Sequence, residues 1–445
     1  MHTLEQSRSL AIWGFGAEGR AAFDYITTQY PLLPLTILND SPLNTVLFAA
    51  GQRVPMICGA DIARSIAARD FDLIVRSPGI SPYRPEMLTA KALGIGSTSV
   101  TNLWFEQNRH SITIAVTGTK GKSTTSRLIQ HLLQSAGRDA DLLGNVGIPA
   151  LGSRLAHDYT VLELSSYQIV DLVHAPDFAL VTNLYPEHTP WHGSIEQYYT
   201  DKLRLVMLDD RTKSIFNYTD AQLRSRFSTR PNTRWFNAPS GFRVENNRLQ
   251  QGDEPIDCSG SPLKGDHNLV NLAAACTLID WLDMEVRPSL ETLKSFRQLP
   301  HRLQEMTFAR NILCVNDSIS TIPEATIAAL KTYPHRDTIL LLGGTERGQD
   351  YTQLYDLLCR SRVRSIFLLP PNGHRIFQEL HGRPAPFEVI STESLAEAVA
   401  QASARLSADS LLLLSPAAPS FGAFANFEER GTVFEALCRA HLSSA

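Results

Sequence analysis

The sequence has no run of the roughly 18 apolar residues that a membrane-spanning helix needs, and it has little excess of either charge. The first absence argues against a membrane protein. A formal net charge of −4 argues against an extended nucleic-acid-binding surface, which requires a basic face. The first residues contain no basic segment followed by an apolar one, so we also expect no signal peptide.

The sequence also lacks closely spaced cysteines. Its six cysteines are scattered, without the C-x-x-C spacing of a zinc or redox site. We therefore expect reduced thiols in a cytoplasmic protein. With 445 residues, of which 43% are hydrophobic and 19% charged, the chain has the composition of a globular protein with room for about two to four domains.

The stretch ITIAVTGTKGKSTT at 112–125 carries the clearest motif. Residues 112–116 are apolar and β-branched, as in a buried parallel strand, and a helical pattern begins at Lys122. Strand, Gly-rich loop and helix N-terminus together present backbone N–H groups to a phosphate. Lys122 can reach the outer phosphates, and the Ser123 hydroxyl can bind Mg²⁺.

This loop is a variant of the usual P-loop, since Val116 stands where the common form has glycine. The other interpretation is a Gly-rich turn with a chance GKS sequence, but the strand before it and the helix after it favour ATP binding. The predicted ATP-binding residues of the loop are Gly118, Thr119, Lys120, Gly121, Lys122, Ser123 and Thr124.

A predicted strand at 9–16 runs into a second Gly-rich loop, GFGAEG at 14–19, which precedes a helical pattern. Further strands are predicted at 35–38 and 71–75. Because ligands bind outside the carboxyl ends of parallel strands, the loops after these strands should face one site. A lone GxGxxG is compatible with NAD as well as with another nucleotide or a sugar nucleotide. The candidate residues are Gly14, Gly16, Asn39, Asp40, Ser77 and Gly79.

The rest of the chain alternates strands and helices, which is typical of largely parallel sheets. A helical pattern at 194–208 carries Lys202, and another opens at GDHN, residues 265–268. Residues 219–262 predict only short strands and loops. The remaining strands are predicted at 159–164, 178–183, 213–217, 312–315, 338–342, 365–369 and 411–414.

Eight short motifs occur in an order that resembles the Mur ligases, the ATP-dependent amino-acid-adding enzymes of peptidoglycan synthesis. The Gly-rich start, LPHR, NDS and the tail LLSPAAPSFGAFANFEERG are most similar to the glutamate-adding branch, which extends UDP-N-acetylmuramoyl-L-alanine. The resemblance covers nearly the whole chain. The motifs are TGTKGKST at 117–124, GNVG at 144–147, LELSS at 162–166, NLYPEH at 183–188, Lys202, GDHN at 265–268, LPHR at 299–302 and NDS at 316–318.

The resemblance implies an α/β protein of three domains. A Rossmann-like domain at 1–107 would bind the UDP-sugar. A central P-loop-type ATPase domain with a parallel sheet would span 108–299, and a Rossmann-like domain at 300–445 would bind glutamate. The resemblance also implies the use of ATP and Mg²⁺. Together with the composition, we expect a cytoplasmic monomer with no membrane span and no nucleic-acid partner.

In this family the γ-phosphate of ATP activates a carboxylate as an acyl phosphate, which the incoming amine attacks. The resemblance implies that Lys122 pairs with the outer phosphates, that Ser123 and Glu163 hold one Mg²⁺, and that His188 binds a second metal. Lys202 matches the family's carbamylated lysine, whose oxygens suit a hard cation. Without the resemblance, a helical lysine would be taken for a surface residue. Nucleotide-facing positions are matched by Asn268, Asn271, Arg302 and Asp317.

On the substrate side, the family's muramoyl-alanine positions are matched by Asn145, Ser165 and Gln168. The glutamate positions are matched by Thr321, Arg347, Ser420 and Phe427. Where D-glutamate enzymes have lysine after the Asp-Ser pair this chain has Ile319, and Arg347 replaces another family lysine, although the two cations are not interchangeable at a carboxylate. The altered loop favours the branch that couples L-glutamate over the D-glutamate branch. Ser41-Pro42 stands where an arginine is common near the uracil end.

Three other functional classes share part of this pattern. A ligase like the folylpolyglutamate synthases would share the P-loop and the modified lysine but would lack a complete Gly-rich N-terminal domain. A nucleotide-dependent regulator without ligase activity would be expected to lack Glu163, His188 or Lys202. A dinucleotide dehydrogenase is excluded less firmly.

Overall fold

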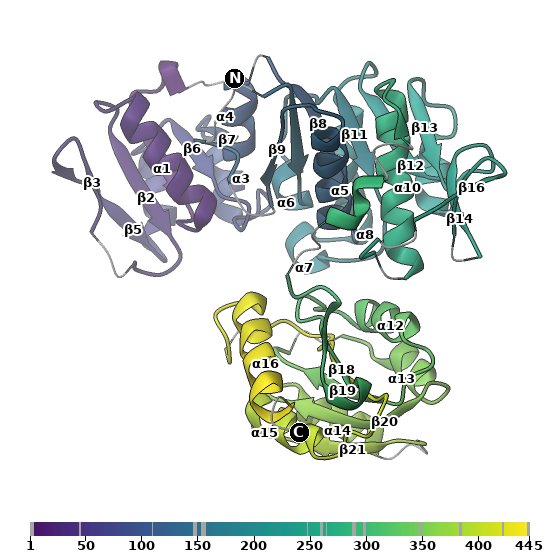
Figure 1. The fold of residues 1–445 in the computed structure, drawn as a ribbon. Helices are drawn as coiled ribbons and strands as arrows, with labels where there is room; N and C mark the ends of the chain where they lie inside the picture. The colour runs from purple at the N-terminus through teal and green to yellow at the C-terminus, as the bar shows by residue number, and fades with distance from the viewer. Residues whose placement is uncertain are drawn as a thin grey trace. The chain divides into compact units, whose positions relative to one another are not determined.

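Two compact units make up the protein (Figure 1). Met1–Ser259 and Val270–Lys294 form the first unit, and Gly260–Leu269 and Ser295–Ala445 form the second. No helix within the described ranges is long and apolar enough to cross a membrane. The computed structural model describes residues 4–43, 46–108, 110–145, 149–152, 157–246, 248–258, 261–263, 265–286, 291–296, 300–346, 349–381, 385–420 and 422–442.

The first unit begins with a five-stranded parallel sheet in the order β5-β2-β1-β6-β7. Its central strands β1 (Leu10–Trp13) and β6 (Leu73–Arg76) are wholly buried, as expected of a parallel sheet covered on both faces. The other elements are η1 (Leu4–Gln6), α1 (Ala17–Gln29), β2 (Leu35–Asn39), the hairpin β3 (Phe48–Ala49) and β4 (Gln52–Arg53), β5 (Met56–Cys58), α2 (Asp61–Ala68), α3 (Pro85–Ala92), β7 (Gly96–Ser99) and α4 (Val100–Gln107).

A second parallel sheet of this unit has six strands in the order β13-β12-β11-β8-β10-β9. β8 (Ile112–Thr117) lies between β10 (Tyr159–Glu163) and β11 (Phe178–Val181), so the loops after these three strands meet at one edge. The other elements are α5 (Lys122–Ser135), β9 (Ala140–Gly144), α6 (Ser166–Ile169), α7 (Thr189–His192), α8 (Ile195–Met207), β12 (Lys213–Asn217), α9 (Ala221–Phe227), β13 (Thr233–Phe236), an antiparallel sheet of β14 (Phe242–Glu245), β15 (Arg248–Gln251) and β16 (Glu254–Ile256), α10 (Asp266–Trp281) from Val270 on, and most of η2 (Thr292–Ser295).

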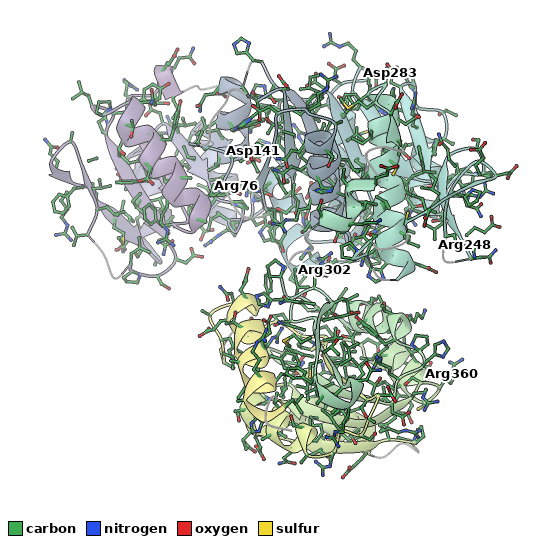
Figure 2. The ribbon with its side chains drawn as sticks, viewed as in Figure 1. Arg76, Asp141, Arg248, Asp283, Arg302 and Arg360 are labelled. Atoms are coloured by element: carbon green, nitrogen blue, oxygen red, sulfur yellow. The ribbon has the colours of Figure 1, made fainter. Side chains whose placement is uncertain are left out.

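Arg76, at the end of β6, joins the N-terminal sheet to the segment around α6 (Figure 2). Its buried guanidinium donates from Nε to Asp171 at 2.9 Å and from Nη2 to the carbonyl of Tyr167 at 2.9 Å. Its Nη1 donates to the carbonyl of Ile80 at 2.7 Å. A buried cation is costly unless it is paired and hydrogen-bonded, so these contacts fix the end of β6 against the segment around α6.

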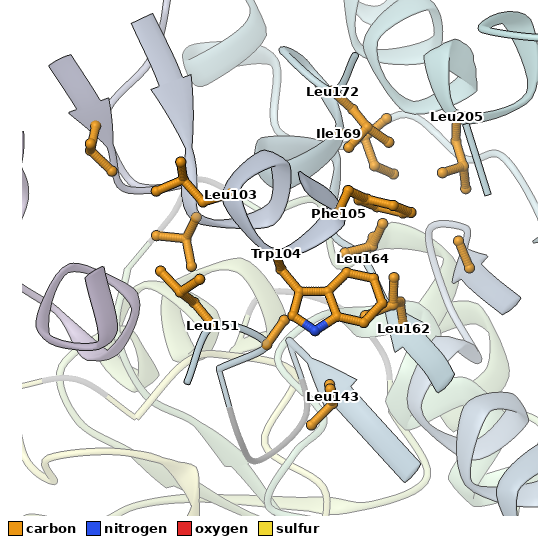
Figure 3. Close-up of a cluster of buried hydrophobic side chains, with 14 of the residues drawn as sticks. Leu103, Trp104, Phe105, Leu143, Leu151, Leu162, Leu164, Ile169, Leu172 and Leu205 are labelled. Atoms are coloured by element: carbon orange, nitrogen blue, oxygen red, sulfur yellow. The ribbon is translucent and has the colours of Figure 1, made fainter. Parts of the chain in front are cut away.

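An apolar core continues across the same boundary (Figure 3). Trp104 and Phe105 of α4 pack in one cluster with Leu143 of β9, Leu162 of β10 and Leu164. Burying side chains of this size contributes on the order of 2 kcal/mol each. The loops of the N-terminal sheet are therefore held in a defined position beside α6.

The second unit contains a six-stranded sheet in the order β17-β18-β22-β19-β20-β21. β17 is antiparallel to β18, and the other neighbours are parallel. The Leu-rich strands β19 and β22 are wholly buried. Its elements are β17 (Gln304–Thr307), η3 (Ala309–Asn311), β18 (Leu313–Asn316), α12 (Pro323–Thr332), β19 (Thr338–Gly343), α13 (Thr352–Leu358), β20 (Val363–Leu369), α14 (Gly373–His381), β21 (Glu388–Ser391), α15 (Leu395–Ser403), β22 (Leu411–Leu414) and α16 (Phe427–Leu442).

The predicted α/β fold with largely parallel sheets is confirmed. The predicted strands 213–217 and 411–414 coincide with β12 and β22. The strand predicted at 178–183 is too long, because β11 ends at Val181. The next two residues instead donate hydrogen bonds to the carbonyl of Lys120 in the Gly-rich loop after β8. β7 was missed because its sequence, GSTS, is polar. The division at 107 and 299 into three domains stays a prediction.

Candidate functional site

The Gly-rich loop between β8 and α5 requires both of its glycines. Gly118 has φ of 138° and Gly121, the N-cap of α5, has φ of 85°, values that other residues rarely adopt. A Cβ on Gly118 would overlap the hydroxyl of Thr182, and one on Gly121 would overlap the side chain of Asn271. The backbone of the loop is thereby left open at the N-terminus of a 14-residue helix, where an anion is favoured.

The loop is tied to the residues that follow β11. Thr119 N donates to the carbonyl of Asn183 at 2.9 Å, and Lys120 N donates to Asn183 Oδ1 at 2.8 Å. The carbonyl of Lys120 accepts from Thr182 Oγ1 at 2.5 Å and from Asn183 Nδ2 at 3.0 Å. These bonds order the loop before a ligand binds, which lowers the entropy lost on binding.

Two lysines converge on this loop. Lys122 Nζ donates to the carbonyls of Gly118 and Thr119, each at 3.1 Å. Lys202 on α8 is buried, donates to the carbonyl of Gly118 at 3.1 Å and lies 5.1 Å from the centre of the Tyr198 ring. Burial, followed by the charge of Lys122, holds the pKa of Lys202 well below its usual range. The interpretation of Lys202 as a surface lysine is wrong.

Glu163 ends β10 beside the loop and is fully buried. Its Oε1 accepts from Asn145 Nδ2 at 3.0 Å, and its Oε2 has no hydrogen-bond partner within the described part of the chain. A buried carboxylate oxygen is costly unless a hydrogen-bond donor or a cation compensates it. Glu163 is therefore suited to a divalent cation, and its role as a metal ligand stays a prediction. Residues 146–148 of the predicted GNVG motif lie outside the described residues.

His188 lies after β11 with φ of 58°. Its Nδ1 is 3.0 Å from the hydroxyl of Tyr167, and its Nε2 is 3.5 Å from Glu187 Oε2. Desolvation lowers the pKa of His188 to about 4 against the opposing charge of Glu187, so the imidazole is neutral at pH 7 and suited to a metal. Glu187 Oε1 also pairs with Lys120 Nζ at 2.9 Å.

Among the residues that the structure describes, no group of three or more His, Cys, Asp or Glu side chains is arranged to hold a metal ion. The predicted ligand set contains only two residues of those types, Glu163 and His188. Ser123 lies in the first turn of α5 and Lys202 faces the loop. A divalent cation here would take its other oxygen donors from the Ser123 hydroxyl, a modified lysine, water or the nucleotide.

The loops after β1, β2 and β6 meet, as the sequence predicts. Ser77 Oγ donates to the carbonyl of Gly14 at 2.6 Å, and Phe15 N donates to Asn39 Oδ1 at 3.2 Å. Gly14 has φ of 87°, and Gly16 is the N-cap of α1. These contacts join the loops after β2 and β6 to the residues just before the start of α1. The carbonyl of Gly79 accepts from Trp191 Nε1 at 3.3 Å.

Arg84 supplies a cation that sequence reasoning missed. Its Nη1 is 3.0 Å from both carboxylate oxygens of Asp40, and its guanidinium lies 4.9 Å from the centre of the Trp13 ring. The sequence has Ser41-Pro42 where an arginine is common in the family that it resembles, and the fold places Arg84, just before α3, beside the same loop. Only the tertiary structure reveals this pair, because 44 residues separate its members.

Ser165 and Gln168 form a capping box at α6. Gln168 Oε1 accepts from the backbone N of Ser165 at 2.8 Å and from its hydroxyl at 3.0 Å. Gln168 Nε2 donates to the carboxyl of Glu18. The two predicted substrate residues are thus one hydrogen-bonded group that reaches the N-terminal Gly-rich loop.

The predicted nucleotide residues belong to both units. Asn271 lies in the first unit, against Gly121 of the Gly-rich loop after β8. The buried Asn268 lies in the second unit. Asp317 is buried and accepts from Ser415 Oγ at 2.8 Å and from the hydroxyl of Ser320. Burial raises the pKa of Asp317 to about 6, while the charge of Arg302 acts in the opposite direction.

Three of the predicted glutamate residues lie around the carboxyl end of the second unit's sheet, and Arg347 lies outside the described residues. The carbonyl of Thr321 accepts from Gln349 Nε2 at 2.7 Å, and the carbonyl of Phe427 accepts from Ser318 Oγ at 2.8 Å. Ser420 lines a pocket with Gly343, Gly344, Phe424 and Arg430.

Sequence reasoning did not single out Asn183, Glu187 and Tyr198, which hold the ATP loop and its neighbours in place. Asn183 and Glu187 lie inside the recognised NLYPEH motif, so their position was a usable signal. The hydroxyl of Tyr198 is 2.9 Å from Thr119 Oγ1, but apart from the helical pattern around it the sequence contains no signal for this role.

Comparison with known proteins identifies relatives over nearly the whole chain. The Mur ligase middle domain matches residues 116–279. A UDP-N-acetylmuramoyl-L-alanine--L-glutamate ligase of Xanthomonas campestris pv. campestris is 36% identical over 97% of this chain and 95% of its own length. Proteins of the same name from Xylella fastidiosa and Micromonospora sp. are 37% and 35% identical, covering 96% of this chain and 94% and 96% of their own lengths.

Solved structures of low sequence identity share the fold. The UDP-N-acetylmuramate-alanine ligase MurC of Thermotoga maritima aligns with a TM-score of 0.60 at 16% identity, over 98% of this chain and 99% of its own. The MurF ligase of the same organism, solved in complex with ADP, aligns with a TM-score of 0.61 at 15% identity, over 98% and 96%.

Proposed function

The chain belongs to the Mur ligase family, and we propose that it is the ATP-dependent ligase that couples L-glutamate to UDP-N-acetylmuramoyl-L-alanine, giving ADP and phosphate, in peptidoglycan precursor synthesis. The observation that carries the proposal is the convergence of Lys122, Lys202 and Glu163 on an open Gly-rich loop at the carboxyl end of β8. The similarity to L-glutamate ligases over 97% of the chain supports the choice of substrates. The alternative substrate is D-glutamate.

The chemical problem is that a carboxylate is a poor acyl donor. Transfer of the ATP γ-phosphate to the alanine carboxylate gives an acyl phosphate, and the neutral amine of glutamate then displaces phosphate to form the amide. The protein has to position three substrates and stabilise phosphate charge. The loop N–H groups and Lys122 are suited to the phosphates.

Magnesium fits the same place. Ser123 and the unpaired Oε2 of Glu163 would hold one ion, and the neutral His188 would bind a second. Bound Mg²⁺ supplies neutralisation of the phosphate charge. Lys122 keeps its cationic role beside the ion, and Glu163 itself is buried away from solvent.

Carbamylation of Lys202 is part of the proposal. The lowered pKa favours a neutral amine, which can add to CO₂ and lose one proton to give a carbamate. The carbamate carries a negative charge, whereas an ammonium group beside Lys122 adds a second positive charge. A carbamylated Lys202 would offer oxygen donors to a hard cation.

The N-terminal loops are proposed to bind the UDP part of the substrate, and Asn145, Ser165 and Gln168 its muramoyl-alanine part. The start of α1 is suited to a diphosphate. The second unit would bind glutamate through Thr321, Arg347, Ser420 and Phe427. A cytoplasmic location and the three-domain division at 107 and 299 belong to the same proposal.

The decisive experiment measures phosphate release with ATP, Mg²⁺ and UDP-N-acetylmuramoyl-L-alanine, adding L- or D-glutamate at equal concentration. We expect release that requires all substrates and is fastest with L-glutamate. The Lys122→Ala variant should release no phosphate while remaining folded, because Lys122 is a partly exposed residue in the first turn of α5, where alanine is well tolerated. Near-wild-type turnover by this variant would overturn the assignment of the loop.

A further inference from the structure

Glu18 belongs to the N-terminal Gly-rich motif at 14–19 and contacts Gln168 of α6. It is the second residue of α1, whose N-cap is Gly16. Its carboxyl accepts a hydrogen bond from Gln168 Nε2, and Gln168 Oε1 in turn accepts from the backbone N and the hydroxyl of Ser165. One continuous set of hydrogen bonds therefore links the first turn of α1 to the N-cap of α6.

The environment of Glu18 disfavours its charged form. Part of the residue stays accessible, but the carboxyl is largely surrounded by protein, and this desolvation raises its pKa to about 7. The hydrogen bond from Gln168 and the charge of Arg76 lower the pKa, and the charge of Asp171 raises it. The N-terminal dipole of α1 also favours the anion. Burial outweighs these opposing effects, so Glu18 changes charge near neutral pH.

An anion at the start of α1 would interact with this carboxyl. Backbone N–H groups in the first turn of a helix attract a diphosphate, and a negative Glu18 in the same turn repels it. A neutral Glu18 keeps an oxygen that can accept from Gln168 and removes the repulsion.

We propose that Glu18 is a positioning residue for the UDP-linked substrate. It holds Gln168 and Ser165 against the N-terminal Gly-rich loop, and its carboxyl group takes up a proton when the substrate binds. The proposal rests on the proposed function, because it requires that the UDP-linked substrate bind at this loop. It goes beyond that function by assigning a pH-linked role to a residue outside the predicted site.

Proton uptake predicts a separation of kinetic effects. As the pH rises through 7 and Glu18 loses its proton in the free protein, the affinity for the UDP-linked substrate falls. The maximal rate at saturating substrate does not follow the same titration, because the bound form is already neutral. The KM for this substrate should therefore rise with pH while kcat is unaffected by Glu18.

The experiment is calorimetric titration of the protein with UDP-N-acetylmuramoyl-L-alanine at pH 7.5 in two buffers of different ionisation enthalpy. The substrate's diphosphate and carboxylate do not titrate there. Wild-type protein should take up about half to one proton per substrate bound. Glu18→Gln, which retains an oxygen acceptor for Gln168, should lose that uptake and should bind more tightly than wild type at pH 8.5.

Glu18→Ala isolates the positioning effect. At pH 6, where the wild-type carboxyl is mostly neutral, this variant should bind about fivefold to tenfold more weakly, because Gln168 loses its acceptor. Glu18→Gln should match wild type at that pH. Asp24→Asn changes an exposed carboxylate on the same helix and should behave as wild type throughout.

The outcomes separate the two proposals. A wild-type protein that neither binds the UDP-linked substrate nor ligates glutamate contradicts the proposed function. Binding with equal proton uptake and equal pH dependence in wild type and Glu18→Gln contradicts the role of Glu18. If Glu18→Ala fails to fold, the comparison of wild type with Glu18→Gln still decides.

Discussion

Lys122 and Lys202 donate hydrogen bonds to the same acceptor, the carbonyl oxygen of Gly118, each at 3.1 Å. Two ammonium groups on one oxygen repel each other, and Lys202 is also buried, so its neutral amine is favoured. Converting that amine to a carbamate replaces repulsion from Lys122 with attraction. The geometry of this pair therefore favours the modification that the sequence could suggest only by resemblance.

Lys202→Ala is expected to reduce phosphate release by about a hundredfold or more, since a preorganised charge at the reacting phosphates is lost. Added short-chain carboxylates should restore part of the activity by supplying the missing oxygens. The matched control is Lys91→Ala, which removes an exposed lysine from α3 and should leave the rate unchanged. A fully active Lys202→Ala would exclude a role for this residue in metal binding.

The part of the site that is local in sequence could be predicted. The strand, loop and helix around Lys122 lie within the continuous stretch 112–135, and backbone geometry alone explains the glycines. The exposure of Lys202 could not be predicted, because a helical pattern does not say which polar side chain turns inward. Glu163 meets Asn145 and Arg84 meets Asp40 across 18 and 44 residues, so these pairs depend on strand order, which the sequence did not specify.

Arg84→Ala is expected to raise the KM for the UDP-linked substrate several-fold with little change in kcat. Arg84 positions Asp40 in the loop after β2, far along the chain from the ATP loop, so its loss should weaken binding without removing a group that acts on the phosphates. Steady-state kinetics with the UDP-linked substrate varied at saturating ATP and glutamate tests this. Arg64→Ala, which removes an exposed arginine from α2, serves as the control. A several-fold loss in kcat with an unchanged KM would contradict the role of Arg84 in binding the UDP-linked substrate.

Asp317→Asn should change how stability depends on pH. Burial raises the pKa of Asp317 from 3.8 to about 6, so its stabilising contribution is complete below about pH 4 and is lost as the pH rises through 6. Between pH 5 and 7.5 the free energy of unfolding of wild type should fall, relative to the variant, by roughly 1–2 kcal/mol. Urea unfolding at several pH values measures this.

The control for that series is Asp356→Asn, which changes an exposed carboxylate of α13 in the same unit. Its stability difference from wild type should be the same at each pH. If the Asp317→Asn difference were equally constant, the carboxyl would not titrate in this range, and the assigned cause of its pKa shift would be wrong.

The choice of glutamate enantiomer is the sharpest test of the substrate assignment. The site has to grip two carboxylates and present a neutral amine to the acyl phosphate. Inverting Cα exchanges the directions of the amine and the side chain, and a misplacement of about 1 Å can reduce the rate about a hundredfold. A pocket built for one enantiomer should therefore discriminate strongly.

The chain's own residues favour the L-enantiomer. Ile319 replaces the lysine of the D-glutamate enzymes, which leaves Arg347 as the predicted carboxylate partner, with Thr321 and Ser420 as hydrogen-bond donors. Arg347→Ala should raise the KM for L-glutamate severely, whereas Arg360→Ala, at an exposed position after α13, should not. Product formation with each enantiomer at equal concentration is the assay. A clear preference for D-glutamate would remove the L-specific assignment and return the chain to the D-glutamate branch of the family.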